Sequence, residues 1–247
     1  MKFLLTELFA VIGLSTVLLS AESNSTKIEV KKEVVDYQQK LDELLQKTAI
    51  DLKNNTIDNN ITIARDYNAV GYYYNKTGKT DLALEYYLKA TNIAEDQKKP
   101  HLKLKTIYYN NVATAYEQLK KFPLALKYYN KALIIYKDTL PQGHPYIAGT
   151  SYDIANIYEQ MGDMDKALKY HQDALNIRIA SLRPLNHPDT IASYDKVLQL
   201  YTEKKEYDQV LKYGKQLLDL VNGDIKIDLQ KKLDDIVKIQ QKIKIKK

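Results

Sequence analysis

The sequence contains no cysteine among its 247 residues, and this absence removes several classes of chemistry at once. Without a thiol the chain has no disulfide framework, no thiolate metal site, no cysteine nucleophile and no lipid-modified cysteine. Tryptophan is also absent, and the chain has only 8 Gly and 6 Pro. Because these residues leave little material for turns other than at helix ends, the composition indicates a structured, mainly helical protein.

The excess of positive charge is small and localised. The formal net charge is +6, from 37 Lys and Arg against 31 Asp and Glu. The last segment, Asp224–Lys247, holds eight lysines and four aspartates, so it carries +4 and leaves +2 for the rest of the chain. Because the body is nearly neutral, the basic tail is weak evidence for a nucleic-acid-binding surface, and no nucleic-acid partner is predicted.

The N-terminal segment, Met1–Ala21, combines a positive charge at Lys2 with an apolar run over Leu8–Leu19. A charged start, an apolar core and small residues after it are typical of a secretory signal, so we predict export to the periplasm or the outside after cleavage. An uncleaved membrane anchor is the alternative, because a helix over Phe3–Leu19 would span roughly 25 Å against a hydrocarbon core of ~30 Å. An apolar helix of the folded domain is disfavoured, since the run lacks polar periodicity.

An internal repeat organises most of the remaining chain. Alanines and tyrosines recur with a spacing of 42 residues, at Ala83, Ala125 and Ala167 and at Tyr74, Tyr116 and Tyr158. A fixed period in this range indicates stacked helical hairpins rather than one globular core. Four hairpins of about 42 residues are predicted within residues 61–222, over Ile61–Glu95, Leu104–Lys137, Ile147–Leu182 and Asp189–Val221.

Two further segments flank the repeats. Residues 22–60 begin as a polar linker and continue as an amphipathic helix, whose second half matches a degenerate half-repeat. Residues 223–247 contain apolar residues at helical spacing from Ile225 to Ile243, beside the lysine-rich tail. Both helices are predicted to cap the stack, because the ends of a solenoid need a polar outer side for solubility.

Residue types at the repeated positions follow from helix ends and helix packing. Gly78 and Gly162 are placed to end a helix in the left-handed conformation, and Pro145 and Pro188 stand where a new helix begins. Small residues are predicted where two helices approach closely, at Gly71, Ala83, Ala113, Ala125, Ala155 and Ala167. The fourth hairpin departs from this pattern, with Leu198, Val210, Gly214 and Leu217, which we interpret as exchange in an end repeat.

Several motifs in the hairpins and their linkers point to one family. A His-Pro loop occurs twice, in Gln142–Pro145 and Asn186–Asp189, and helix motifs occur in Tyr109–Ala113, Asp165–Tyr170 and Ala174–Arg178. Together these residues resemble the tetratricopeptide repeat family, and more narrowly its kinesin-light-chain-like subclass. The resemblance implies an all-α fold, a right-handed α-solenoid of stacked antiparallel helix pairs. It also implies a protein or peptide partner, without identifying one.

No catalytic, cofactor or metal site is predicted. Gly71 and Gly78 enclose six residues where a phosphate-binding loop has about four, and no strand precedes them. The four histidines lack the spacing of a zinc site on one helix, and helix capping and packing account for them. Carboxylates are plentiful, but none is predicted in an apolar setting that would tune an acid or base, so no enzymatic activity is expected.

The remaining candidate is the concave face, formed by the exposed side of the first helix of each hairpin. Alignment of the repeats assigns twelve residues to it, namely Arg65, Asn68, Tyr72, Asn75, Asn110, Thr114, Glu117, Tyr152, Asn156, Glu159, Asp195 and Gln199. Asparagine can donate to and accept from an extended peptide backbone, and tyrosine gives contact area at low entropic cost. An ordinary solvated face is the alternative. Asn68 and Tyr72 do not support the family's carboxylate-clamp arrangement. Asp153 and Lys196 stand where the family's Asn-Asn-Leu-Ala helix motif has its second asparagine.

The charge of this face favours a partner with a basic segment. In the second to fourth hairpins its columns hold five acids, Glu117, Asp153, Glu159, Asp195 and Glu203, with Lys196 as a single base. Arg65 and Lys76 lie at the first hairpin, so the face is predicted to be acidic over most of its length and basic at one end. Focused charge in a concave site attracts the opposite sign. We therefore predict an exported, non-enzymatic interaction scaffold. The alternatives are a membrane-anchored assembly or regulatory factor, in membrane contact through residues 1–21, and a non-catalytic subunit of an enzyme or secretion complex.

Overall fold

The structure is a computed structural model that describes residues 24–53, 60–96, 101–181 and 187–245. Within these ranges the chain forms ten helices and no strand, so the all-α prediction is confirmed. The predicted signal or anchor segment, Met1–Ala21, lies outside the described residues. None of the described helices is both long enough and apolar enough to cross a membrane.

Four antiparallel helix pairs lie between a long N-terminal helix, α2 (Asn24–Lys53), and a C-terminal helix, α11 (Gly223–Ile245). The pairs are α3 (Asn60–Lys76) with α4 (Thr80–Glu95), α5 (Leu102–Gln118) with α6 (Phe122–Thr139), α7 (Pro145–Gln160) with α8 (Met164–Ser181), and α9 (Pro188–Glu203) with α10 (Tyr207–Leu218). Each helix packs mainly against the helices that precede and follow it in the chain.

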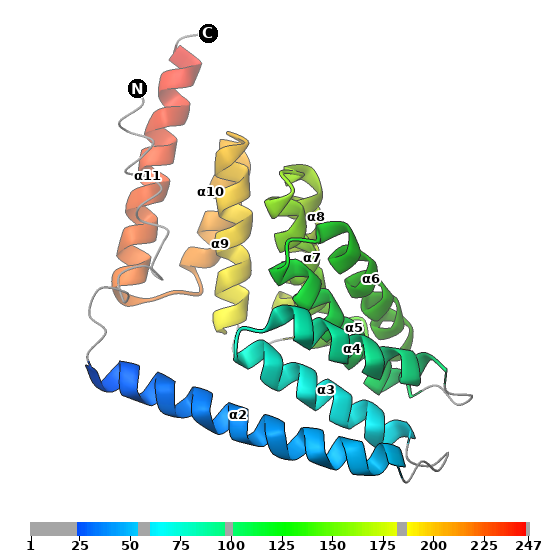
Figure 1. Ribbon diagram of the computed structural model, residues 1–247. Coiled ribbons are helices and arrows are strands. Elements are labelled where there is room, and N and C mark those ends of the chain that lie inside the picture. Colours follow the sequence, from blue (N-terminus) through cyan, green and yellow to red (C-terminus); the bar gives the residue numbers. More distant parts are fainter. Residues whose placement is uncertain (1–23, 54–59, 97–100, 182–186, 246–247) are drawn as a thin grey trace.

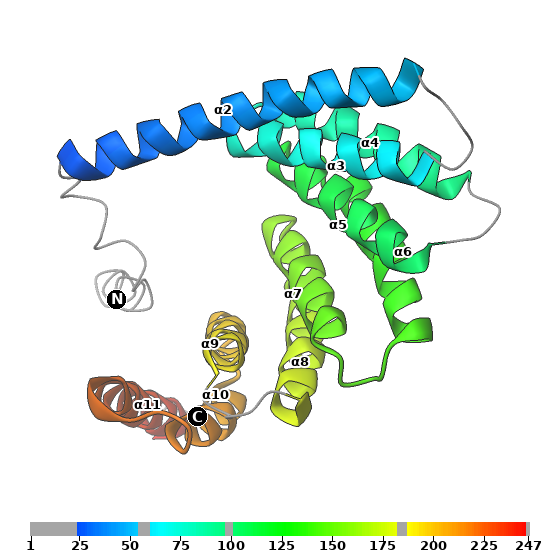
Figure 2. The same ribbon diagram turned by 90° about the horizontal axis from the view of Figure 1, so that it is seen from below.

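The pairs stack into a curved arc, with α2 and α11 at its two ends (Figure 1). Figure 2 shows α3, α5, α7 and α9 toward the inside of the curve and α6, α8 and α10 toward the outside. This arrangement confirms the predicted right-handed α-solenoid of stacked antiparallel helix pairs. The inside surface of α3, α5, α7 and α9 is called the inner face below.

The turn inside each helix pair ends the first helix with one residue in the left-handed conformation. Gly78 and Gly162 have φ of 76° and 79°, which confirms their predicted role. The other two pairs use lysine instead, Lys120 with φ 56° and Lys205 with φ 60°. In all four turns this residue donates its N–H to a carbonyl three residues earlier, and the next N–H donates to one five residues earlier. These two hydrogen bonds satisfy backbone carbonyls that a helix end otherwise leaves unpaired.

The two His-Pro linkers cap the helices that follow them. Nδ1 of His144 accepts a hydrogen bond from the N–H of Tyr146 at 3.2 Å, and Nδ1 of His187 accepts one from Asp189 at 3.2 Å. Pro145 and Pro188 are the first residues of α7 and α9. The histidine nitrogen accepts from a backbone N–H of the first helical turn that has no intrahelical partner. Proline at the first position of the helix removes no intrahelical hydrogen bond, because the N–H there would have no partner in the helix. The predicted capping role of these histidines is therefore confirmed.

Small residues allow the close approach of paired helices, as predicted. The alanines at these positions are buried, and a Cβ atom on Gly71 would lie 2.6 Å from Cδ1 of Tyr87 and 3.0 Å from the carbonyl oxygen of Ala83. A side chain at position 71 would therefore push α3 away from α4. The ring of Tyr87 fills the space that this glycine leaves.

The two end helices cover the terminal pairs. On α2, Leu41 and Thr48 are buried, and Nζ of Lys47 donates to both carboxylate oxygens of Asp66 on α3, at 2.8 and 2.9 Å. On α11, Leu233 and Ile236 are buried in the same apolar cluster as residues of α8, α9 and α10. The lysine-rich outer side of α11 stays in solvent.

Candidate partner-binding face

Side chains bridge successive helices of the inner face at three junctions, α3 with α5, α5 with α7, and α7 with α9. A side-chain hydrogen bond spans each junction: Asn111 Nδ2 donates to Asn68 Oδ1 at 2.7 Å, and Gln160 Nε2 donates to Glu117 Oε1 at 3.3 Å. At the last junction Lys196 Nζ donates to Glu159 Oε1 at 2.9 Å and also to Oε2. The three junctions are called the first, second and third junction below. They differ in charge.

At the third junction an internal ion pair holds Glu159. Nζ of Lys196 lies 2.9 and 3.1 Å from the two carboxylate oxygens, and Nε2 of His171 lies 3.4 Å from Oε2. Burial lowers the pKa of His171, so the ring is neutral and its Nε2–H tautomer donates to Glu159. The hydrogen bond from His171 and the Lys196 ammonium lower the pKa of Glu159 against its partial burial. Glu159 is therefore a charged group that the protein itself compensates.

Tyr152 belongs to the same cluster. Its ring packs edge-to-face on His171, with the ring centroids 4.8 Å apart, and the Arg178 guanidinium lies 4.7 Å from the centroid of Tyr152. Arg178 is only 8% exposed and donates to the carbonyl of Asp189 at 2.9 Å and to Oγ of Ser193 at 2.5 Å. A buried arginine that stacks on an aromatic ring and is hydrogen-bonded twice is fixed in place.

At the second junction Glu117 has neutral partners. The hydroxyl of Tyr129 donates to Oε2 of Glu117 at 3.1 Å and lies 3.0 Å from Oγ1 of Thr114. Gln160 donates to the other carboxylate oxygen of Glu117. No lysine or arginine forms an ion pair with Glu117 within the described residues. The carboxylate is thus oriented by two side chains, Tyr129 and Gln160, but it is not neutralised.

Asp153, on α7, adds a second carboxylate to this junction. It is partly buried and has no hydrogen-bond donor among the residues that the structure describes. Burial and, to a smaller extent, the Glu117 carboxylate raise the pKa of Asp153 to about 6, and Arg178 opposes both effects. The prediction that no carboxylate lies in a setting that tunes its acidity is therefore wrong at Asp153. Desolvation together with a like charge is the physical reason.

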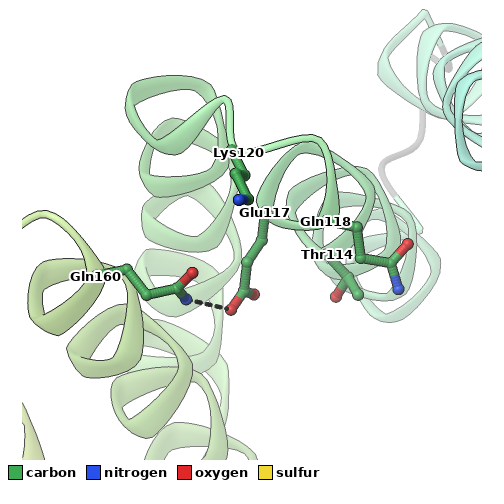
Figure 3. Close-up of a pocket in the computed structure, with 5 residues that line it drawn as sticks. All are labelled: Thr114, Glu117, Gln118, Lys120 and Gln160. Carbon is green, nitrogen blue, oxygen red and sulfur yellow. Dashed lines mark hydrogen bonds between the residues drawn. The ribbon is translucent and has the colours of Figure 1, made fainter.

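A pocket of about 380 Å³ opens beside these groups, between α5 and α7. Its lining residues are Thr114, Glu117, Gln118, Lys120 and Gln160. Figure 3 shows Glu117 and Gln160 pointing toward each other from neighbouring helices, with Lys120 on the turn at the end of α5. The pocket joins two predicted site residues, Thr114 and Glu117, to side chains that the alignment did not select.

The first junction is neutral. Asn68 is bonded to Asn111, as described above, and Asn110 donates to the hydroxyl of Tyr136 at 3.0 Å. Tyr72 is 45% exposed and has Nζ of Lys76 5.5 Å from its ring centroid. Arg65 is exposed, and Asn75 is partly buried with an Oδ1 that accepts no hydrogen bond from the described residues. These side chains lie apart from the acidic residues of the second junction.

The remaining predicted residues form no single cluster. Gln199 donates to Oε1 of Glu203 at 3.0 Å on the same helix. Asp195 is exposed; desolvation by the protein around it raises the pKa of its carboxyl, and Lys232 opposes this effect. Asn156 is partly buried and makes no side-chain hydrogen bond with the described residues. The twelve residues thus divide into an end of amide and aromatic side chains with one base, Arg65, an acidic centre, and an end at which Glu159 is paired with Lys196.

The sequence of this chain matches a repeat profile over residues 62–138 and 146–222, and the profile is that of the tetratricopeptide repeat. The chain belongs to the tetratricopeptide repeat family. Proteins built from these repeats serve protein–protein interaction and are generally non-catalytic. No curated protein matches the sequence.

Solved structures share the fold at low sequence identity. BtubC (BKLC) from P. vanneervenii has a TM-score of 0.63 at 16% identity, over 85% of this chain and 83% of that one. A kinesin light chain protein from Podosopora anserina, with nearly identical tetratricopeptide-like repeats, has a TM-score of 0.62 at 18% identity, over 81% and 97%. RapI in its apo form has a TM-score of 0.61 at 17% identity, over 85% and 54%. The predicted resemblance to the tetratricopeptide repeat family is confirmed, and kinesin-light-chain-like repeat proteins are among the structures that share the fold.

Three residues of the tetratricopeptide repeats matter to this face but were not selected from the sequence. Gln160 follows Gln118 by 42 residues, so the period could have found it. Arg178 lies on an outer helix and reaches inward, and Lys120 lines the pocket from a turn. No group of three or more His, Cys, Asp and Glu residues is placed to hold a metal ion within the described ranges.

Proposed function

We propose that this tetratricopeptide repeat protein is a non-enzymatic interaction scaffold that binds an extended protein or peptide segment along its inner face. The segment carries at least one basic residue and lies over the second to fourth helix pairs. The observation that carries this proposal is the acidic second junction, where Glu117 and Asp153 lie beside an open pocket without a neutralising protein cation among the described residues. Concave acidic sites attract basic partners and raise association rates.

The other carboxylates of the face support the same location. Glu159 is neutralised by Lys196, whereas Glu117 and Asp153 at the second junction form no ion pair with a lysine or arginine among the described residues. Asn68, Asn110 and Tyr72 flank the centre with amide and aromatic groups that suit a peptide backbone. A partner held by such groups lies extended and places one basic side chain at the second junction.

Site-specific photo-crosslinking in native extract tests which face is used. A photoreactive amino acid at Gln118 or Gln199, on the inner helices, should capture the partner. The same amino acid at the exposed Lys127 or Lys169, on α6 and α8, serves as the control and should capture little. Capture from the outer positions alone would assign binding to the convex side and overturn the inner-face proposal.

We also propose that the protein is exported and that its mature chain begins near Glu22. The support is the sequence of Met1–Ala21, with its charged start and apolar run. Intact-mass measurement of native material should give the shortened chain outside the cytoplasm. A full-length mass in the membrane fraction would favour the anchored alternative, and a full-length mass in the cytosol would overturn export.

A further inference from the structure

The 42-residue repeat places a matched pair of side chains at each junction of the inner face. The earlier helix supplies Asn75, Glu117 or Glu159, and the later helix supplies Asn111, Asp153 or Lys196. The first three are 42 residues apart, and the second three are 42 and 43 residues apart. The first pair is therefore two amides, the second two carboxylates, and the third a carboxylate with an ammonium.

The third junction shows how this position accommodates a cation. The Lys196 ammonium contacts both oxygens of Glu159, and the two side chains are only 29% and 20% exposed. His171 lies on the outer helix of the same pair as Glu159, and its Nε2 contacts the carboxylate from that side. Tyr129 occupies the equivalent place one repeat earlier, 42 residues before His171, and supports Glu117 in the same way.

The second junction has the same framework but no cation from the protein at the corresponding position. Asp153 stands where Lys196 stands one repeat later, and it accepts no hydrogen bond from the described residues. Arg178, the nearest buried cation, is held by Ser193 and the Asp189 carbonyl. Lys120 lines the pocket, yet it forms no ion pair within the described residues.

We propose that the bound segment supplies the cation that the second junction lacks, as a lysine or arginine side chain lying between Glu117 and Asp153. This assignment rests on the proposed function and identifies its central contact. The cation of the partner takes the position that Lys196 takes one repeat later. It enters through the pocket between α5 and α7, which is open to solvent and about 380 Å³ in volume. A charge-assisted contact at a partly buried carboxylate gives specificity for a basic residue at one point of the segment.

Asp153→Lys tests this assignment, because it places a lysine at the second junction where Lys196 stands at the third. The new lysine should pair with Glu117 as Lys196 pairs with Glu159, and so block the cation of a partner. The matched control is Asp173→Lys, which makes the same charge change at an exposed position on α8. Asp153→Asn removes the charge with little change in volume and replaces the lysine variant if that variant does not fold.

The probe is a display library of random short peptides, selected on the full chain and then measured one by one. Peptides selected by the wild-type chain should contain a lysine or arginine whose replacement by norleucine weakens binding roughly tenfold to a hundredfold. Binding of the same peptides should fall by a similar factor in Asp153→Lys and stay unchanged in Asp173→Lys. The norleucine replacement should then have no further effect in Asp153→Lys, because the two changes remove one contact.

Two results would overturn the assignment in different ways. Peptides that crosslink to the inner face but tolerate norleucine, or bind Asp153→Lys as well as wild type, would disprove the cation position and leave the proposed function intact. Peptides and native partners that crosslink only to the outer helices would disprove the proposed function together with it.

Discussion

A Cβ atom on Gly214 would lie 2.4 Å from Cδ2 and 2.9 Å from Cδ1 of Leu233. The backbone of α10 and the leucine of α11 are therefore in direct contact at a place where the earlier repeats have Tyr87, Tyr129 and His171. In those repeats the ring contacts the neighbouring inner helix, as Tyr129 contacts Glu117. In the last repeat the capping helix uses the space instead, which gives the end-repeat exchange at Gly214 a packing reason.

Gly214→Ala should therefore destabilise the protein. Overpacking costs about 1–3 kcal/mol, and the better helix propensity of alanine offsets about 1 kcal/mol, so we expect a net loss of about 1 kcal/mol in urea unfolding. Gly71→Ala should cost more, because its neighbours are the Tyr87 ring and the Ala83 carbonyl, which move aside less easily than the end of a leucine. An equal or higher stability for Gly214→Ala would show that α11 docks more loosely than its contacts indicate.

The turn lysines offer a stabilising change. Lys205 has φ of 60°, a conformation that costs a residue with a side chain roughly 1–2 kcal/mol and costs glycine far less. Lys205→Gly should therefore raise the free energy of unfolding by about 0.5–1 kcal/mol, after the greater backbone entropy of glycine is deducted. Gly162→Lys makes the reverse exchange at the equivalent turn and should lower it by a similar amount. Thermal melts of the two variants should move in opposite directions.

Much of the fold could be predicted because the repeat follows local rules. The step of 42 residues locates Ala83, Ala125 and Ala167 at helix crossings, since a close approach requires a small side chain wherever it recurs. Gly78 and Gly162 identify left-handed helix ends for the same kind of reason. Lys120 and Lys205 adopt that conformation although lysine does not favour it, so no local signal in the sequence could predict it there.

The candidate site was less predictable, because its contacts depend on how one repeat is rotated on the next. The bond from Gln160 to Glu117 and the ion pair of Lys196 with Glu159 both cross a junction, where side chains meet at a geometry that no single helix determines. Of the five acids predicted for this face, Glu159 is paired with Lys196, and this pairing removes it from the net charge of the face. Burial of Asp153 follows from the same packing.

Ala167 and Val210 occupy equivalent positions in the third and fourth pairs and are both buried in one apolar cluster. Ala167→Leu should overpack the crossing of α7 and α8 and lower the free energy of unfolding by roughly 1–3 kcal/mol. Val210→Leu adds less volume at a position that already accommodates a larger side chain, so its loss should be smaller. Thermal melts that give equal losses would contradict the assignment of these two positions as equivalent crossings.

Asp153 should make stability depend on pH in a direction opposite to that of an ordinary paired carboxylate. The titratable and charged groups that face it are Glu117 on α5, Tyr129 on α6, Tyr152 on its own helix and Arg178 on α8. Burial raises the pKa of Asp153 to about 6, against about 3.9 for an aspartate in an unfolded chain. The folded state therefore binds this proton more tightly than the unfolded state does.

Because the folded state binds this proton more tightly, the contribution of Asp153 to the free energy of unfolding rises as pH falls from about 6 to about 4. This contribution is lowest above pH 6. Asp153→Asn removes the ionisable group, so at pH 7 to 8 the variant should be more stable than wild type by roughly 1–3 kcal/mol. The two proteins should converge below about pH 4, where aspartate is protonated in both states. Urea unfolding followed by tyrosine fluorescence at a series of pH values measures the difference directly.

Because Glu95 and Glu159, whose pKa values are lowered, are present in both proteins, their opposite pH dependence cancels in the comparison. A difference that stays constant from pH 4 to pH 8 would show that Asp153 is not desolvated at the second junction.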